Sequence, residues 1–244
     1  MEADMSYFVL AFALTGIIAF IITELGDVPL NALFCKIIAS FGFILVFVAV
    51  VAEKALADIS PFYVGAVYFG NAPILLLFLL GLIAGLIGDI VLGLRPLRPK
   101  EENEKLILSG MISFSVGHVF YYAALLIIYQ FSVYAILIAA IMTVVIHFGG
   151  KILKLEFGRL HVASLAYTLI VFLVFGQALI NAIAQGFTVA STLLAVGAFL
   201  FALSDLILAQ IYFGGKTAKG FIASNLGTYY AAQLLIAFSL FFLA

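Results

Sequence analysis

Long apolar runs separated by short polar segments dominate the chain. Eight of these runs are long enough to cross a hydrocarbon layer about 30 Å thick at a helical rise of about 1.5 Å per residue. They lack the apolar/polar alternation of barrel strands, and lipid offers no partner to backbone N–H and C=O groups, so the pattern predicts helices. The predicted spans are residues 6–23, 32–52, 72–94, 106–128, 131–148, 160–180, 189–212 and 221–243.

Composition agrees with this pattern. Hydrophobic residues make up 66% of the chain and charged residues 9%, and the mean hydropathy is +1.32, which excludes an ordinary soluble domain. We therefore expect an all-α, polytopic membrane protein in which residues 1–244 form a single transmembrane domain. In a bacterium, its location would be the cell membrane. The loops are too short for a soluble catalytic domain, so any chemistry must use side chains of the helices.

Basic residues collect on one side of the predicted membrane. The positive-inside rule then predicts that the basic loops are cytoplasmic and that both termini are outside. The acidic N-terminal segment has no basic region before its apolar run, so we expect a retained first helix and not a signal peptide. The formal net charge of −1 gives no sign of a nucleic-acid partner. With eight spans, the opposite face carries Lys54, and the basic face carries Arg95, Arg98, Lys100, Lys105, Lys151, Lys154, Arg159, Lys216 and Lys219.

Two parts of the sequence resemble each other. The segment "GDIVL" is followed one span later by "YYAALLI", and "SDLIL" is followed one span later by "YYAAQLLI". The two copies lie four spans apart, so the matching helices run in the same direction. This pattern predicts a parallel internal repeat of four helices, with the halves related by an axis along the membrane normal.

Two aspartates interrupt apolar spans at a similar depth. Asp89 and Asp205 both fall in the half of the membrane near the basic loops, where an ionisable group costs about 3 kcal/mol unless it faces the bundle interior, water or a partner. Their common level predicts one shared pocket; the alternative is that each carboxyl only links helices by hydrogen bonds. Lys36 enters the second span from the same side and is the expected counter-ion, unless it extends to the lipid headgroups.

Polar side chains on the fourth span add to this group. His118, Tyr121 and Tyr122 lie near the middle of that span, and helical spacing places His118 and Tyr121 on one face. A histidine inside the membrane either takes part in chemistry or donates a hydrogen bond between helices. We expect His118 to contribute to the site.

A polar stripe follows the last span. Asn225, Tyr229 and Gln233 recur at a spacing of four residues on an otherwise apolar helix, and lipid contact would penalise them, so the stripe should face inward. Small residues on the third span would let a neighbouring helix approach closely. These residues are Gly81, Gly85 and Gly88.

The sequence predicts neither a metal nor another cofactor. His147 and His161 fall beside basic residues at the cytoplasmic ends of their spans, where contact with lipid headgroups explains them. A zinc site needs three or four converging ligands, and His118 should be about 15 Å or more from both of these histidines, given its distance along the helices. The lone Cys35 is expected to be a packing residue.

Five blocks of the sequence together resemble the lysoplasmalogenase family of YhhN-like membrane proteins. The resemblance extends over residues 30–240, and the blocks keep the order and span placement of the family. The blocks are Lys36, "GD" at 88–89, "GHVFYY" at 117–122, "GAFLFALSD" at 197–205 and "TYYAAQLLI" at 228–236.

The resemblance implies an intramembrane hydrolase. Such an enzyme cleaves the vinyl ether bond of lysoplasmalogens to give a fatty aldehyde and a glycerophospho-alcohol, so the expected partners are a lysophospholipid substrate and membrane lipids. Two carboxyl groups suit the acid–base steps of this hydrolysis. The expected catalytic residues are Asp89, Asp205 and His118, and the expected substrate-binding residues are Lys36, Tyr121, Tyr122, Asn225, Tyr229, Tyr230 and Gln233.

Two other functions compete with this prediction. Paired aspartates and duplicated halves also occur in small-solute and proton-coupled transporters. A lipid-binding or assembly protein without turnover is the third reading. The sequence leaves the oligomeric state and the headgroup open.

Overall fold

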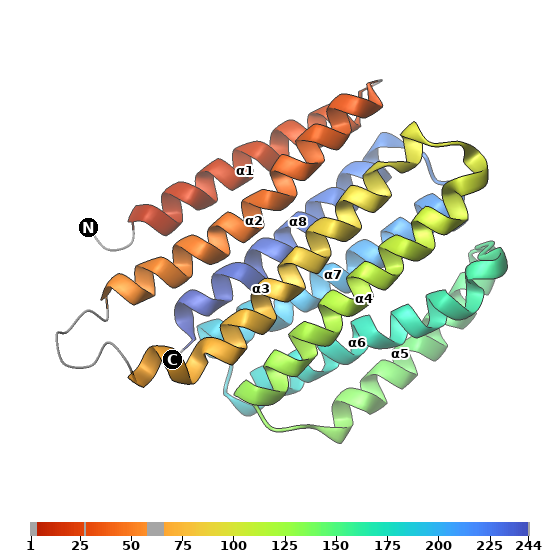
Figure 1. Cartoon of the computed structure of the whole chain (residues 1–244). Coiled ribbons are helices and arrows are strands. Elements are labelled where there is room, and N and C mark those ends of the chain that lie inside the picture. The colour runs from red at the N-terminus through yellow and green to blue at the C-terminus, as the bar shows by residue number, and fades with distance from the viewer. Residues whose placement is uncertain (1–3, 27, 58–65, 244) are drawn as a thin grey trace.

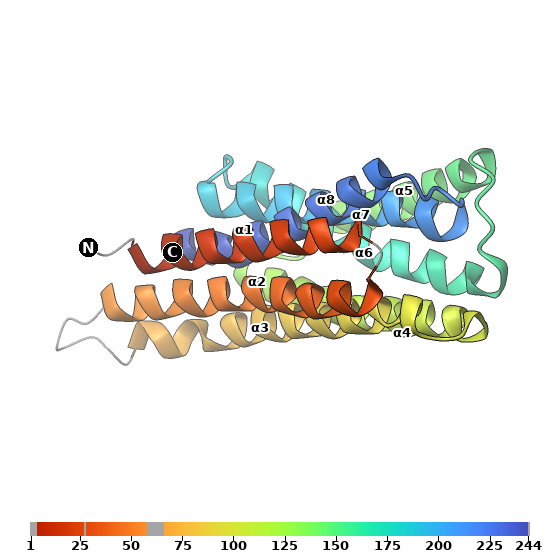
Figure 2. The ribbon, with the colours of Figure 1, turned by 90° about the horizontal axis from the view of Figure 1, so that it is seen from above.

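The computed structural model describes residues 4–26, 28–57 and 66–243. Within these ranges the chain forms eight helices that are long and apolar enough to cross a membrane. They run side by side along one common direction, as the two views in Figures 1 and 2 show. The helices are α1 (Asp4–Glu24), α2 (Pro29–Ala57), α3 (Ala66–Gly93), α4 (Asn103–Ile128), α5 (Val133–Ile152), α6 (His161–Ala184), α7 (Val189–Phe213) and α8 (Lys219–Ser239).

Each predicted span corresponds to one helix, and the differences lie at the ends. The pattern of apolar residues marks the part of a helix inside lipid, whereas a helix continues until its backbone finds other partners. Helix α3 therefore begins at Ala66, before the predicted start at residue 72, and Pro73 lies inside it. Short 3₁₀ turns follow or precede the long helices at Arg95–Leu97, Lys100–Glu102, Gly158–Leu160 and Leu240–Phe242.

The helices pack as four consecutive pairs: α1 with α2, α3 with α4, α5 with α6, and α7 with α8. Helix α4 also packs on α6, and α8 packs on α2. A shift of four helices turns α4 into α8 and, if α1 is counted after α8, turns α6 into α2. The two contacts are therefore equivalent under the predicted parallel repeat. Helices α1 and α2 lie at one side of the bundle and α5 and α6 at the other (Figure 1).

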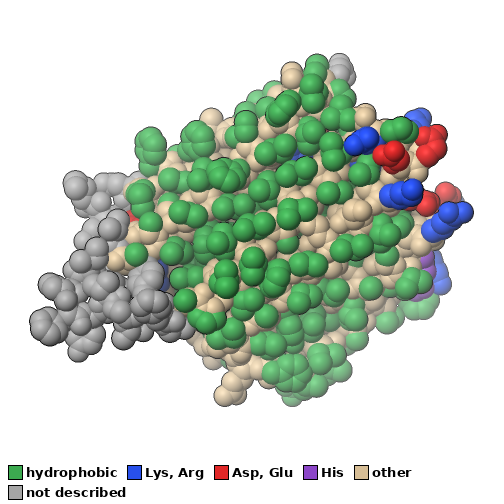
Figure 3. Space-filling model, in the orientation of Figure 1, with side chains coloured by type: hydrophobic (Ala, Val, Ile, Leu, Met, Phe, Trp, Pro, Cys, Tyr) green, Lys and Arg blue, Asp and Glu red, His purple; other side chains and the backbone are tan. Residues whose placement is uncertain are grey.

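Both chain termini lie at the same end of the bundle (Figure 1). Charged side chains gather at the other end, around the turns between the paired helices (Figure 3). This arrangement agrees with the predicted separation of basic loops from termini; that the charged end is cytoplasmic stays a prediction of the positive-inside rule.

Three of the glycines of α3, Gly81, Gly85 and Gly88, let side chains of neighbouring helices reach its backbone. A Cβ atom at Gly85 would lie 2.6 Å from the amide nitrogen of Gln233, and one at Gly88 would lie 2.7 Å from the ring of Phe114. A Cβ atom at Gly81 would overlap the ring of Tyr121. The small face predicted for this helix therefore receives polar and aromatic groups of α4 and α8.

Candidate functional site

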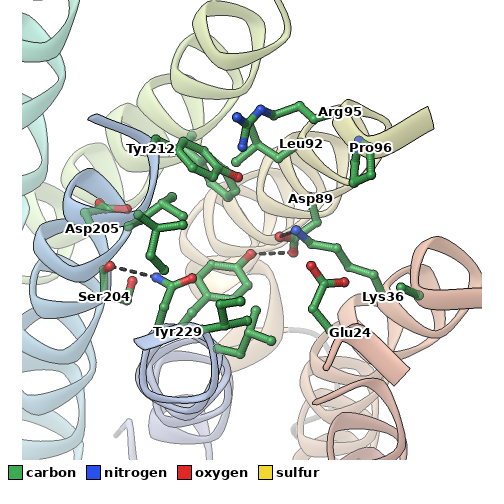
Figure 4. A pocket seen from close by; sticks show the side chains of 18 of the residues that line it. Glu24, Lys36, Asp89, Leu92, Arg95, Pro96, Ser204, Asp205, Tyr212 and Tyr229 are labelled. Atoms are coloured by element: carbon green, nitrogen blue, oxygen red, sulfur yellow. Dashed lines mark hydrogen bonds and ion pairs between the residues drawn. The ribbon is translucent and has the colours of Figure 1, made fainter. Parts of the chain in front are cut away.

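A polar cavity of about 330 Å³ lies at the charged end of the bundle, between α1, α2, α3, α7 and α8. Both predicted aspartates line it, and they stand on opposite sides of the space (Figure 4). The two carboxyl groups come from α3 and α7, the helices that the predicted internal repeat would relate to each other. Five Asp, Glu, Lys and Arg side chains line the cavity: Glu24, Lys36, Asp89, Arg95 and Asp205.

Asp89 is held by three groups and is almost fully buried, at 2% exposure. The hydroxyls of Ser40 and Tyr229 donate to its Oδ2 at 2.7 and 2.6 Å. Lys36 Nζ lies 3.5 Å from Oδ1. Lys36 and Ser40 are one helical turn apart on α2 and thus share a face. A buried charge requires such a partner, and Lys36 turns inward to supply it instead of extending to the headgroups.

A directed series of hydrogen bonds leads from the middle of the membrane to Asp89. The hydroxyl of Tyr229 has one proton, which it donates to Asp89, so it must accept the hydrogen bond from Gln233 Nε2 at 3.3 Å. Tyr121 donates to Gln233 Oε1 at 3.0 Å. The predicted stripe of α8 therefore faces inward, and it orients the hydroxyl that touches Asp89.

Tyr230 supports Asp89 from behind. Its hydroxyl lies 2.9 Å from Ser40 Oγ. Because Ser40 donates its single proton to Asp89, Tyr230 is the donor in this contact. The side chain is buried, at 1% exposure, so it acts through Ser40 and does not meet the cavity.

Asp205 has a different environment. The hydroxyl of Tyr167 on α6 donates to its Oδ2 at 2.8 Å. Among the described residues, no cation forms an ion pair with it. Asn225 fixes the adjacent backbone, because its Nδ2 donates to Ser204 O at 2.7 Å. Each aspartate thus accepts a hydrogen bond from a hydroxyl group on the preceding helix, but among the described residues only Asp89 also forms an ion pair.

Arg95 lies at the mouth of the cavity. Its guanidinium carbon is 3.7 Å from the ring centroid of Tyr212, a distance at which a cation and an aromatic face attract each other. Its buried Nε has no hydrogen-bond partner among the described residues. Arg95 therefore offers donors to an anionic group that enters the cavity (Figure 4).

His118 and Tyr122 do not line this cavity. His118 is buried, with Nδ1 2.9 Å from Phe114 O and its ring centroid 4.3 Å from that of Phe201. Tyr122 packs against the apolar core. Of the predicted site residues, Lys36, Asp89, Asp205, Asn225 and Tyr229 line the cavity. Tyr121, Tyr230 and Gln233 reach it through hydrogen bonds.

Several residues of the site did not stand out in the sequence. Ser40 had a signal, since it lies one turn beyond Lys36 on the same helix face. Glu24 also had one, because it interrupts the end of an apolar run, and its carboxyl group points into the cavity near Lys36 (Figure 4). Tyr167 and Tyr212 had none, because single tyrosines are common at membrane interfaces and in helix contacts.

The described part of the chain contains no group of three His, Cys, Asp or Glu side chains that could hold a metal ion. His147 and His161 meet edge to face at the charged end of the bundle, with ring centroids 5.1 Å apart.

Comparison with known proteins adds one finding. Searches of curated sequences and of solved structures gave no match. The model of the YhhN family matches residues 59–240, a range that contains Asp89, Asp205 and the polar stripe of α8. Since this match covers well over half of the chain, the protein belongs to the YhhN family.

Proposed function

We propose that this protein hydrolyses the vinyl ether bond of lysoplasmalogens, releasing a fatty aldehyde and a glycerophospho-alcohol. The observation that carries the proposal is the pair of carboxyl groups, Asp89 and Asp205, on opposite sides of one cavity inside a membrane bundle. Membership of the YhhN family supports it, because the family is associated with this activity. The reaction needs an acid, a negative charge and an oriented water molecule, and two carboxyl groups can divide these tasks.

The partners of the two carboxyl groups suggest their roles. Lys36 and two hydroxyl donors compensate a negative charge on Asp89, so we assign it the role of carboxylate. Asp205 has one hydroxyl partner and no paired cation among the described residues. Charge in such a place is costly, so we assign Asp205 the role of proton donor.

The reaction then proceeds in three steps. Asp205 transfers its proton to the vinyl carbon β to the ether oxygen, which leaves an oxocarbenium ion facing the carboxylate of Asp89. Water adds to the carbon bonded to oxygen and gives a proton to Asp89, forming a hemiacetal. The bond from that carbon to the glycerol oxygen breaks as the hydroxyl proton moves to this oxygen, and Asp205 regains a proton through water from Asp89.

The positive groups of the site suit the phosphate of the substrate. Arg95 lies at the cavity mouth with a buried nitrogen that has no described partner, and a guanidinium group binds phosphate oxygens well. Lys36 is already paired with Asp89. Arg95 is therefore the group that we assign to the headgroup phosphate.

Aldehyde release from a synthetic lysoplasmalogen by detergent-purified protein tests the proposal. Asp89→Asn and Asp205→Asn should each lower turnover at least about 100-fold, the usual loss when an acid or base is removed. Glu101→Gln, a change of the same kind at an exposed carboxylate, should leave turnover unchanged. Full activity in a folded Asp89→Asn or Asp205→Asn variant would refute the mechanism, and no aldehyde from the unaltered protein would refute the substrate.

The repeated packing of the helices supports one competing function. Parallel repeats with ionisable groups at their interface are common in transporters. A carrier would accumulate a solute in liposomes without aldehyde release, whereas the proposed hydrolase would release aldehyde in detergent, where no gradient exists.

A further inference from the structure

A second cavity lies beside the polar one. Its volume is about 320 Å³, and it is enclosed mainly by apolar side chains of α4, α5, α6 and α7. The polar cavity lies on the other side of α7, toward α1, α2, α3 and α8. One cavity thus contains charged groups, whereas the other favours the binding of hydrocarbon.

Five residues line both cavities and form their boundary. They are Leu92, Phe114, Asp205, Leu208 and Tyr212. Asp205 is the only one of the five with a carboxyl group. It accepts a hydrogen bond from the hydroxyl of Tyr167, which lines the apolar cavity. Asp89, in contrast, lines the polar cavity and is absent from the residues lining the apolar one.

The apolar cavity can be reached from the bilayer. Val145 on α5 lines it and keeps 55% of its surface exposed, and Leu153 lines it with 58% exposed. In a membrane these exposed apolar surfaces face lipid. A hydrocarbon chain can therefore enter sideways without passing through water.

We infer that the apolar cavity binds the single hydrocarbon chain of a lysophospholipid whose headgroup occupies the polar cavity beside Arg95. This inference rests on the proposed function and deepens it. A vinyl ether bond joins the glycerol to the chain, so a lipid bound in this way places that bond at the boundary, against Asp205. The same placement explains why Asp205 and not Asp89 delivers the proton to a chain carbon.

Chain-length dependence of binding tests the inference separately from catalysis. The ligands are saturated alkyl-ether lysophosphoethanolamines of increasing length, which have no vinyl group to protonate. Each methylene that enters the cavity should tighten binding up to about fourfold, until the cavity is full and the gain stops. Competition with a fluorescent lysophospholipid in one detergent gives the affinities, and comparison between variants cancels the partition of the ligands into micelles.

Gly149→Phe should lower the chain length at which the binding affinity stops increasing, because the added ring fills part of the cavity. Gly149 lines the cavity one turn beyond Val145, and a Cβ atom there meets no heavy atom within 4 Å, so the backbone tolerates a side chain. Gly227→Phe is the matched control. A Cβ atom at Gly227 also meets nothing within 4 Å, and Gly227 is not among the residues that line either cavity.

Met111→Ala is the opposite change, since it enlarges the same cavity and should let longer chains gain affinity. It also provides a test if Gly149→Phe does not fold. The inference is overturned if the chain-length limit of the folded Gly149→Phe or Met111→Ala variant equals that of the unaltered protein. Chain-length limits that shift as expected while no aldehyde forms from lysoplasmalogen would support the chain site and reject the proposed hydrolysis.

Discussion

Replacement of Lys36 by methionine isolates the contribution of the buried ion pair. Methionine keeps most of the apolar stem and removes the charge that lies 3.5 Å from Asp89 Oδ1. The two side chains keep only 13% and 4% of their surface exposed, so the carboxylate would lose its cation in a place with little water. Removal of one partner of a buried pair costs about 3–5 kcal/mol. We expect about 3 kcal/mol, because Lys36 is partly exposed to the cavity.

The reciprocal change should cost less. Asn at position 89 keeps an oxygen that accepts from Ser40 and Tyr229, and Lys36 lies near the start of α2, where its long side chain can extend to the headgroups. We expect about 1 kcal/mol for Asp89→Asn, the value of a typical hydrogen bond. The double variant should be close to Asp89→Asn alone, which gives a coupling of about 3 kcal/mol.

Unfolding by SDS in mixed micelles measures these differences. The chain has no tryptophan, so loss of helix is followed by far-ultraviolet circular dichroism. A loss below about 1 kcal/mol in Lys36→Met would be typical of an exposed pair. That result, or equal losses for the two single variants, would refute the view that Lys36 neutralises a buried carboxylate.

Three further changes test other contacts. Tyr167→Phe removes the donor to Asp205 and should lower aldehyde release about tenfold; unchanged turnover would show that this contact does not position the acid. Gln233→Leu leaves buried hydroxyl groups without their amide partner and should lower SDS stability by about 1–3 kcal/mol, and a neutral result would contradict the hydrogen-bond series to Asp89. Gly88→Ala places a methyl group 2.7 Å from the ring of Phe114 and should cost about 1–3 kcal/mol in the same assay, whereas no loss would mean that the ring moves freely.

The helices and the side of the charged loops followed from local sequence. An apolar run in lipid must satisfy its own backbone hydrogen bonds, so each run forms a helix whatever its neighbours are. Each of the eight predicted spans corresponds to a helix within the described ranges. Helix ends did not follow from local sequence, because they depend on turns and loops outside the lipid; α3, for example, begins before residue 72, where its span was predicted to start.

The depth of ionisable groups also followed from sequence, since the rise per residue fixes the distance of a side chain from the end of its helix. Asp89 and Asp205 were expected at one level, and they line one cavity. His118 was expected to join them from the same reasoning. Depth alone does not give the direction in which a side chain points, and His118 packs against Phe201.

Only the tertiary structure decided which polar groups meet. The hydroxyl groups that donate to Asp89 belong to Ser40 and Tyr229, which are 49 and 140 residues away in sequence. The hydroxyl group that donates to Asp205 belongs to Tyr167 on α6. Such contacts depend on the rotation of each helix about its axis and on which helices are neighbours. Packing of side chains across the whole bundle sets both, whereas backbone hydrogen bonding within each apolar run sets the helices themselves.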